Sequence, residues 1–558
     1  MKLRFSALII SLFCLLSAIA QVRIHGKVIE GENEPMEFVT VRIGGTAIGA
    51  TTGLDGSYSL SVARTDTINV IFSCIGYHEI KRQLIDPADD VTLNVKMLPK
   101  STELTEVEVT DFRKQTNQMQ RIDGSASKLS PDVTGGSVEA MLTTLAGVNS
   151  SNEMSSQYSV RGGTYDENSV YINGIEVYRP QLVSSGQQEG LSIINPDMVN
   201  SVAFSTGGYD AEYGDKMSSV LDITYRQPEA FEGSVNISFM GGGITLGQAK
   251  RKFSQLHGFR YKRNSTLLSS LETKGEYNPN FLDYQTNLNF KFSQKFSANI
   301  LGYISVNNYN FIPASRTTNF GTSTDAKQFK VYFDGQERDR FETYFGALSL
   351  NYRHSRATDF TLLASGYLTN ELVAYDIAGE YWLDKAGTTG EGNPDNAIGG
   401  ELGVGRYWEH ARNRLKMSVF QFALKGTTAI HNNNITYGIN FSHEAIHDRT
   451  REWEMRDSAG YTLPSLPDKI AMIYSMSSKH DINSTRISAF AQDTWRLNSN
   501  AGYWALNAGV RVSYWTFNKE TLVSPRANVA FVPEKFSDWT FRFATGLYYQ
   551  APFYKEYR

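Results

Sequence analysis

The 558-residue sequence has little of several features that define common protein classes. Its two cysteines exclude a disulfide scaffold. Its 54 basic and 58 acidic residues leave a net charge of −4, which is too balanced for an electrostatic nucleic-acid binder. The mean hydropathy of −0.34 disfavours a protein with many membrane-spanning helices, because each such helix needs about 20 consecutive apolar residues.

Aromatic residues and glycine are abundant, with 30 tyrosines, 31 phenylalanines and 46 glycines against 15 prolines. Aromatic residues favour strands and glycines favour turns, so the composition predicts long sheets with many turns. The length exceeds that of one ordinary domain. We therefore expect at least two cores or one very large sheet, and an all-β dominated fold.

The N-terminus has the pattern of a secretory signal. Two basic residues precede the apolar run Ala7–Leu16, and the small-residue pattern Ala18–Ala20 follows it, so residues 1–20 are predicted to be cleaved. Cys14 lies inside that run after a bulky residue, where lipid attachment is disfavoured. Cys74 is then the one remaining cysteine, and we expect it to be a small buried hydrophobe.

Residues 21–99 alternate apolar and polar residues in short runs separated by turn residues. The runs predict strands over Val22–Ile29, Glu37–Ile43, Ser57–Val62, Thr67–Phe72 and Val91–Met97. Strands at this spacing indicate a β-sandwich. The strings Gly26–Val28, Phe38–Val41, Gly49–Thr52, Asp55–Tyr58 and Ile75–Tyr77 resemble the carboxypeptidase-regulatory-like domain. That resemblance implies a transthyretin-like sandwich without catalytic residues.

A polar linker, residues 100–124, follows the predicted sandwich. It contains the β-prone string Glu103–Thr110, which lacks helical periodicity. Two interpretations stand at equal weight on the residue types alone. The string is a last sandwich or linker strand, or it is an exposed segment that adds a strand to the sheet edge of a partner.

Residues 125–228 contain four glycine-bearing strings in order, namely Leu145–Val148, Val160–Gly163, Val170–Ile175 and Gly207–Gly214. Each is weak alone, because glycine is common in turns. Together they resemble the small α/β plug domain of TonB-dependent outer-membrane receptors of the Bacteroidetes type. The plug-motif residues carried over are Gly147, Val148, Arg161, Gly162, Gly163, Gly174, Gly207, Gly208, Tyr213 and Gly214.

Two positions depart from the family pattern. Ala146 stands where the family has proline, and Asn173 stands where it has aspartate. The glycines allow positive-φ turns and close backbone approach in a domain that must fit inside a lumen. Arg161 can anchor that domain, because a guanidinium in a polar interior finds carboxylate or carbonyl partners.

Residues 229–558 show the two-residue period of barrel strands. Phe231, Val235, Ile237 and Phe239 alternate with polar residues, and the same phase recurs along 288–292, 504–514 and 539–547. Apolar and polar faces over about ten residues are typical of an antiparallel transmembrane barrel. Short links such as 293–295 alternate with long polar stretches, Asp384–Glu401 and Arg449–Ser484, which predicts short periplasmic turns and long external loops.

The strand arithmetic predicts an incomplete barrel. Glu229–Arg558 provides roughly 13 strands at about 25 residues each with its loop, whereas plugged transporters need about 22 strands to close. The strings 524–526 and 546–552 resemble strings found well inside the family's barrels. We therefore expect the barrel to be C-terminally incomplete.

One string suggests an enzyme. His443, Glu444 and His447 match the HExxH pattern of zinc peptidases, in which both histidines bind the metal from one helical face. An alternating run over residues 435–442 leads into the string, which predicts a strand. On a strand the two histidines lie about 13 Å apart, too far to share one zinc ion. We disfavour the metal site; with His431, these histidines are candidates for a ligand-facing loop.

The resemblance implies an energy-coupled receptor in the cell outer membrane, with its N-terminal domain in the periplasm. It makes Val107, Glu108, Val109 and Thr110 a TonB-box-like contact segment. The implied partners are the inner-membrane TonB complex, outer-membrane lipid and a nutrient such as an iron chelate. A surface lipoprotein is a further open candidate, and no cofactor or nucleic acid is expected. Starch-utilisation transporters are usually longer. The alternative is an uncoupled binding or adhesion barrel.

Overall fold

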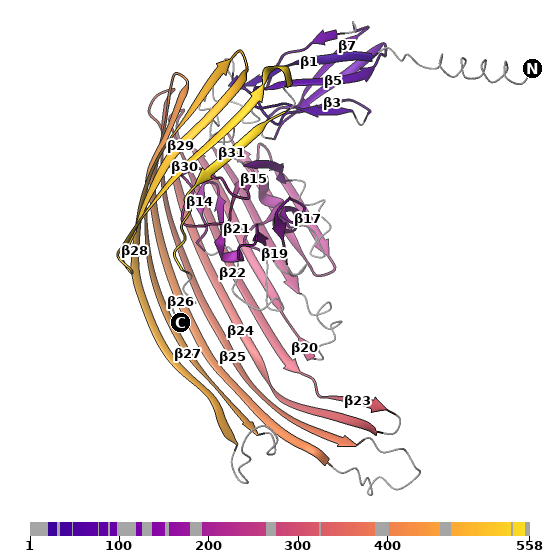
Figure 1. Ribbon diagram of the computed structural model, residues 1–558, viewed down its shortest axis with the longest axis vertical. Helices are drawn as coiled ribbons and strands as arrows, with labels where there is room; N and C mark the ends of the chain where they lie inside the picture. Colours follow the sequence, from indigo (N-terminus) through magenta and orange to yellow (C-terminus); the bar gives the residue numbers. More distant parts are fainter. Residues whose placement is uncertain are drawn as a thin grey trace, which may run out of the picture.

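The computed structural model contains a sandwich, a small central domain and one large curved sheet, in chain order (Figure 1). Among the residues it describes, no helix is both long and apolar enough to cross a membrane. The described residues are 21–30, 34–46, 48–75, 77–87, 90–97, 119–124, 137–150, 156–178, 192–263, 275–322, 325–385, 401–457, 470–536 and 539–552.

The sandwich packs two sheets around one apolar core. One sheet has the order β2-β1-β5, with β8 and β9 also paired to β1, and the other has the order β4-β3-β6-β7. Val22, Ile24 and Val28 are buried at alternate positions of β1, as their pattern predicted. Its strands are β1 (Gln21–Glu30), β2 (Glu34–Pro35), β3 (Thr40–Ile43), β4 (Gly49–Thr51), β5 (Ser57–Ala63), β6 (Thr67–Ser73), β7 (Ile80–Ile85), β8 (Asp90–Thr92) and β9 (Val95–Met97).

Two predicted sandwich strands differ from the observed ones. The strand expected from Glu37 begins only at Thr40, because Phe38 has a φ of 57°, which extended chain does not allow. The last expected strand divides into β8 and β9. Cys74 is a free thiol that is half-buried beside the core rather than inside it, and burial raises its pKa.

The central domain contains a five-stranded sheet in the order β10-β15-β16-β13-β14. Its short helix α3 (Val138–Leu142) begins at Ser137, whose Oγ accepts a 3.2 Å hydrogen bond from the Ala140 amide. The remaining elements are β10 (Gln120–Asp123), β11 (Val148–Asn149), β12 (Ser159–Val160), η2 (Tyr165–Glu167), β13 (Asn168–Ile172), β14 (Ile175–Glu176), η3 (Pro196–Met198), β15 (Val199–Ser205) and β16 (Ser219–Tyr225).

The large sheet is antiparallel, and thirteen of its fifteen strands form one continuous path from β17 to β31. β20 and β23 pair with β22 and β24 at their far ends. The strands are β17 (Glu232–Ser238), β18 (Gly241–Lys250), β19 (Phe253–Arg263), β20 (Gly275–Tyr277), β21 (Asn280–Lys291), β22 (Phe296–Pro313), β23 (Arg316–Thr322), β24 (Asp325–Arg353), β25 (Thr358–Lys385), β26 (Glu401–Ile430), β27 (Asn433–Asp457), β28 (Ala471–Ser499), β29 (Gly502–Trp515), β30 (Glu520–Pro533) and β31 (Phe541–Gly546), with η5 (Glu534–Phe536) after β30.

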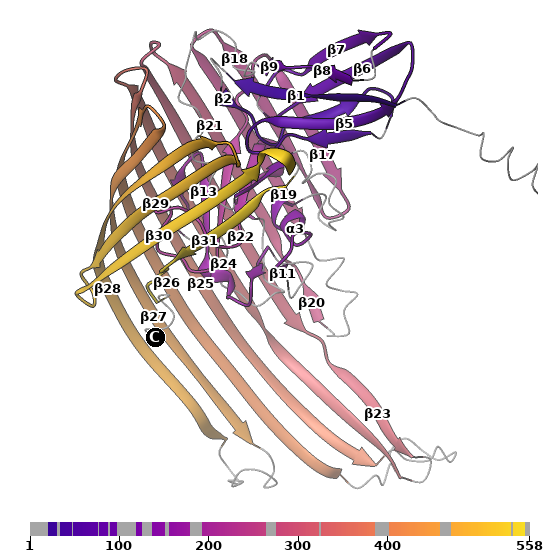
Figure 2. The same ribbon diagram turned by 45° about the horizontal axis from the view of Figure 1, so that its top comes forward.

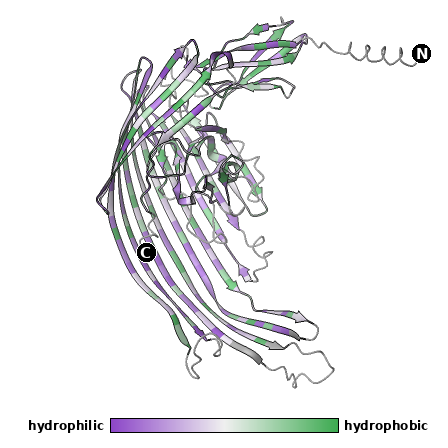
Figure 3. Ribbon diagram, viewed as in Figure 1, coloured by the Kyte–Doolittle hydropathy of each residue, from purple (hydrophilic) through white to green (hydrophobic). Residues whose placement is uncertain are grey.

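The sheet curves around the central domain, which lies on its concave side (Figures 1 and 2). Apolar residues face outward on the convex side, as the alternation predicted; Ile237 is 87% exposed and Ile439 is 58% exposed. The alternation of apolar and polar residues along the strands is visible in Figure 3. On β26 the outward-facing side chains from Phe420 to Ile430 lie within the apolar band. These two residues are ten positions apart, which corresponds to about 33 Å of strand. When the strand is tilted, that length matches an apolar band about 25 Å tall.

The two ends of the sheet differ. One end, which we call the inward end, carries short links such as 293–295, as predicted, and the sandwich. At the other, outward end β24 to β28 extend to between 25 and 30 residues. The long loop expected over Arg449–Ser484 is therefore wrong, because β27 pairs with β28 as far as Arg456 and Ala471. These strands project well beyond an apolar band that about ten residues cross.

The sandwich contacts the concave wall at the inward end. Leu54 is 1% exposed and packs in one cluster with Tyr503 and Ala530 of β29 and β30. Glu34 forms a 2.5 Å ion pair with Arg496 of β28. Within the described residues the end strands β17 and β31 do not pair with each other.

The sandwich core gives a testable prediction. Phe72 is fully buried and packs edge to face against Tyr58 at 5.5 Å, so Phe72→Ala leaves a cavity that costs about 3 to 5 kcal/mol. Hydrogen exchange of the β6 amides in the intact chain should accelerate strongly. The exposed Ile85 provides the control, since Ile85→Ala should leave that exchange unchanged. Equal exchange in wild type and Phe72→Ala would contradict the assigned core.

Candidate functional site

The glycine-bearing strings of the central domain meet in space. Gly147, Gly162, Gly174 and Gly208 all have φ between 72° and 86°, a conformation that glycine adopts without strain. The Arg161 side chain lies close to both Gly147 and Gly207. A Cβ atom added at either glycine would be 3.4 Å from it. Three strings that are distant in sequence therefore share one corner of the domain.

The guanidinium of Arg161 is exposed, and among the described residues it makes no hydrogen bond or ion pair. The anchoring contact expected for it is not formed in this structure. Asn173, in contrast, occupies the β13–β14 turn with a φ of 52°, and its side chain links the domain to the wall. Its Oδ1 accepts from the Tyr225 amide at 2.9 Å, and its Nδ2 donates to Asn287 of β21 at 3.2 Å.

The arginines that hold the central domain come from the wall. Arg511 of β29 lies directly over Gly214, where an added Cβ would come within 2.1 Å of its Nε. The same guanidinium donates to Ser488 of β28 at 2.7 Å and to Asp215 at 3.3 Å. Gly214 is therefore required for close approach.

Arg526 of β30 makes the second of these contacts. Its Nη1 donates to the carbonyl oxygens of Asp210 and Tyr213 at 2.6 Å each, and its guanidinium lies 5.0 Å from the ring centre of Tyr209 and 4.5 Å from that of Tyr548. Asn528 donates to the Asp210 carboxylate at 2.8 Å. We call this set the plug latch: residues 209–215 of the central domain, held by Gln492, Arg511, Arg526 and Asn528 of the wall.

The opposite side of the central domain packs on the wall through an apolar core. One cluster joins residues of its sheet, such as Val202 and Ile223, to wall residues of β19, β22, β24, β25, β26 and β27, namely Leu256, Leu301, Tyr303, Phe345, Ala347, Leu363, Tyr367, Leu415, Met417, Val419 and Ile446. A buried Arg260–Asp283 ion pair supplements it, and Arg260 also donates to the Ile194 carbonyl at 2.8 Å. The domain is therefore held by an apolar core together with polar contacts toward β19–β27, and mainly by polar contacts toward β28–β30.

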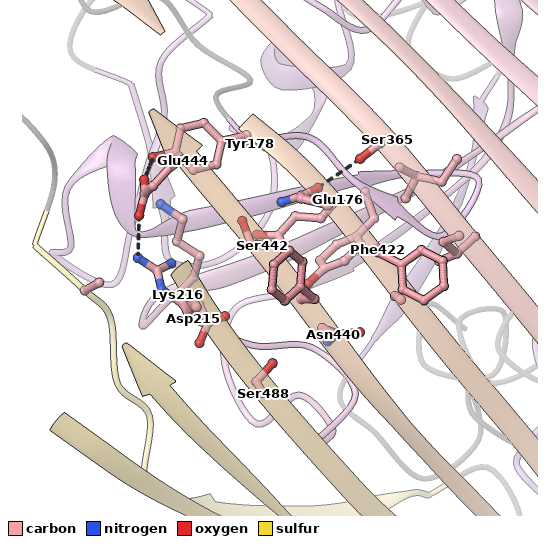
Figure 4. A pocket seen from close by; sticks show the side chains of 18 of the residues that line it. Glu176, Tyr178, Asp215, Lys216, Ser365, Phe422, Asn440, Ser442, Glu444 and Ser488 are labelled. Atoms are coloured by element: carbon pink, nitrogen blue, oxygen red, sulfur yellow. Dashed lines mark hydrogen bonds and ion pairs between the residues drawn. The ribbon is translucent and has the colours of Figure 1, made fainter. Parts of the chain in front are cut away.

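A cavity of about 130 Å³ opens between the plug latch and the wall (Figure 4). Four acidic and four basic residues line it, together with amides, hydroxyls, Tyr178 and Trp515. Tyr178 donates to Glu444 at 2.5 Å, and Glu444 pairs with Arg486 at 3.5 Å. The charged residues are Glu176, Glu212, Asp215, Lys216, Lys425, Glu444, Arg486 and Arg511. This lining suits a polar ligand that carries both signs of charge.

Removal from solvent shifts the pKa of the plug groups beside this cavity. Burial lowers the pKa of Lys216, which donates to the Asp166 carbonyl, and burial raises the pKa of Glu176. Burial opposes ionisation of Asp215 as well, but Arg511 and Arg486 hold the pKa of that carboxyl below its ordinary value. The charged groups on the plug face of the cavity therefore influence one another's pKa, as well as being shifted by burial.

The HExxH string lies on β27, as its alternation predicted. His443 and His447 are on the convex side, where His447 pairs with Asp481 at 2.6 Å, whereas Glu444 is 6% exposed and faces the cavity. Strand geometry therefore separates the Glu from both histidines. Among the described residues, no group of three His, Cys, Asp or Glu side chains is placed to hold a metal ion. His431 has a φ of 53° in the short inward turn between β26 and β27, and so does not lie in a ligand-facing outward loop.

Val107, Glu108, Val109 and Thr110 lie outside the described residues, as do residues 1–20. The remaining predicted plug residues are all described, and Tyr213 and Gly214 belong to the plug latch. The wall residues Gln492, Arg511, Arg526 and Asn528 were missed. Each is a polar residue on the polar face of its strand, which distinguishes none of them from its neighbours.

The fold is a curved antiparallel wall of barrel-type strands with a small plug domain on its concave side. Three family models match the chain: the CarboxypepD_reg-like domain over residues 24–109, the TonB-dependent receptor plug domain over 114–219, and the TonB dependent receptor-like beta-barrel over 261–558. The barrel model alone covers more than half of the chain. The chain therefore belongs to the TonB-dependent receptor family, which places it in the outer membrane.

Known proteins resemble the chain at low identity. The TonB-dependent receptor SusC of Bacteroides thetaiotaomicron is 24% identical over 428 residues, 70% of this chain and 40% of SusC, so the chain spans less than half of that relative. Among solved structures, the ferric citrate transporter FecA is 12% identical with a TM-score of 0.46, covering 75% of this chain and 61% of FecA. The RagAB peptide transporter is 9% identical with a TM-score of 0.43, covering 75% of this chain and 57% of that one.

The plug latch gives a testable prediction. Arg526→Met removes two hydrogen bonds from a charged donor to the carbonyl oxygens of Asp210 and Tyr213, each worth about 1.5 to 3 kcal/mol. Hydrogen exchange of residues 206–218 should accelerate by at least about tenfold, while exchange in β13 changes less. Arg338→Met, at an exposed position of β24, is the control. Unchanged exchange in Arg526→Met would show that the latch does not hold the plug.

Proposed function

We propose that this chain is the receptor of an energy-coupled outer-membrane transporter, which binds a scarce polar nutrient and imports it by rearranging its plug. The observation that carries this proposal is the unequal attachment of the plug. Polar contacts toward β28–β30 can be replaced by water, whereas the apolar core toward β19–β27 resists separation. The plug then opens along the latch while its apolar side stays in place.

The ligand site in this proposal is the cavity beside the latch. A ligand there contacts Asp215 and Lys216 of the plug and Arg511 of the wall together. Its binding is therefore coupled to the latch through shared side chains, and the mixed charge favours a polar solute such as a chelate or a zwitterion.

The partners follow from the same proposal. The TonB complex would pull on Val107–Thr110, and the sandwich and this segment would lie in the periplasm. A surface lipoprotein stays an open candidate. The domain boundaries at residues 20, 99, 124 and 228, the plug-motif roles and the absence of catalysis stay predictions as well. The uncoupled binding barrel is the alternative function.

Deletion of the segment tests the coupling. Removing residues 106–110 should leave ligand binding to cells intact and abolish uptake, because binding uses the cavity and uptake requires the pull. Removing residues 114–118, an equal length of the same linker, is the control for linker shortening. Unchanged uptake after deletion of 106–110 would overturn coupling, and binding without uptake in the wild type would establish the uncoupled alternative.

A metal measurement tests the remaining enzyme hypothesis. Because strand geometry holds His443 and His447 about 13 Å apart, the purified protein should retain no more zinc after dialysis than a His443→Ala, His447→Ala variant does. Stoichiometric zinc in the wild type that is lost in the variant would revive the peptidase interpretation.

A further inference from the structure

A second cavity lies between the plug and the inward end of the wall. Its volume is about 410 Å³, against about 130 Å³ for the cavity beside the latch. The residues at the inward ends of β21, β22, β24, β25 and β26 line it on one side, and the β13–β14 turn and β16 of the plug line it on the other. Gly174, Leu363 and Lys425 line both cavities, so the two are neighbours. We call the second one the inward cavity.

Neutral hydrogen-bonding side chains dominate the lining of the inward cavity. Five amide and six hydroxyl side chains line it, against two acidic and two basic ones, whereas eight charged residues line the cavity beside the latch. Both acidic residues already have partners. Asp222 accepts a hydrogen bond from Tyr213 at 2.9 Å, and Asp359 pairs with Arg353 at 3.4 Å. The lining therefore suits an uncharged group rather than an ion.

Two asparagines in this lining have buried amide atoms without a partner. Asn289 of β21 is directly opposite Asn299 of β22, and the two residues are 8% and 9% exposed. The Nδ2 of Asn299 donates to the Oδ1 of Asn289 at 2.8 Å, whereas the Nδ2 of Asn289 and the Oδ1 of Asn299 have no hydrogen-bond partner among the described residues. Because buried polar atoms are normally paired, this donor and this acceptor indicate a hydrogen-bonding ligand in the cavity.

The same asparagines are linked to the plug. Asn299 also donates to the Oδ1 of Asn287 at 2.6 Å, and that oxygen accepts a 3.2 Å hydrogen bond from the Nδ2 of Asn173 in the β13–β14 turn. Asn173, Asn287, Asn299 and Asn289 thus form one hydrogen-bonded series, which we call the asparagine row. An ionised aspartate at position 173 would interrupt it, because a carboxylate has no proton to donate. The row therefore fixes the orientation of Asn299 from the plug side.

We propose that the inward cavity is a second solute site, which binds a neutral group that both donates and accepts hydrogen bonds. The Nδ2 of Asn289 donates to an oxygen of that group, and the Oδ1 of Asn299 accepts from its N–H or O–H. Peptide amides and sugar hydroxyls share this chemistry. The inference goes beyond the proposed function and does not depend on import, because binding to this site is measured on the purified chain.

Saturation-transfer NMR on the full chain in detergent tests the site. The probes are N-acetylglycine N-methylamide, which provides peptide amides, and methyl glucoside, which provides hydroxyls. At least one probe should bind the wild type, and the probe that binds identifies the source of the group. The variant Asn289→Leu, Asn299→Leu should bind it at least about tenfold more weakly, because two hydrogen bonds are lost. Replacing both asparagines by apolar residues of similar size preserves the packing.

Two further variants separate binding in the cavity from general effects. Ser349→Phe leaves the asparagine row intact but fills the cavity, which the buried Ser349 lines, and should weaken binding as much. Asn280→Leu, Asn308→Leu is the matched control and should bind like the wild type. Asn280 and Asn308 are also directly opposite each other on β21 and β22 and hydrogen-bonded at 3.1 Å, but Asn280 lies nine positions, or about 30 Å of strand, from Asn289.

Three outcomes would overturn the proposal. Neither probe binds the wild type, which would show that the cavity holds water only; either cavity variant binds like the wild type; or the control variant loses as much binding as the cavity variants do.

Discussion

The structure depends on one constraint: inside a membrane every backbone N–H and C=O must be paired within the protein. The long antiparallel registers from β17 to β31 meet it, and they turn alternate side chains to opposite sides of the sheet. The convex side becomes apolar, so the concave side receives the polar residues. A polar concave wall is what allows arginines such as Arg511 and Arg526 to hold a plug.

The polar side of the plug explains why close packing and easy release are compatible. Arg526 binds backbone carbonyls, which every sequence provides, and Gly214 allows Arg511 to approach the chain. Water can satisfy the same carbonyls and guanidinium groups after separation, so the net free energy of each contact is modest. Water cannot replace the apolar contacts on the other side of the plug, so that cluster keeps the plug in position against the wall.

The sequence predicted local features well, because they depend on neighbouring residues. The outward phase of Ile237, the β13–β14 turn at Asn173 and Gly174, and the strand through His443 all follow from short patterns. The plug latch does not, since Arg511 and Asp215 are separated by 296 residues. The outward strands over Arg449–Ser484 were mistaken for a loop because water contacts both of their faces, which removes the apolar period that identifies a strand.

The contact of the sandwich with the wall has a mechanical consequence. Leu54 of the sandwich packs against Ala530 and Val532 of β30, and Asp210 of the plug is held by Arg526 and Asn528 of the same strand. The last described strand of the sandwich ends at Met97, and the described part of the chain resumes at Met119, just before β10 of the central domain. Tension applied between these residues therefore loads both attachments at once, and the one with the lower rupture force yields first. Under such tension the sandwich would act as a tether, and the strength of its contact with the wall would set how much force reaches the plug.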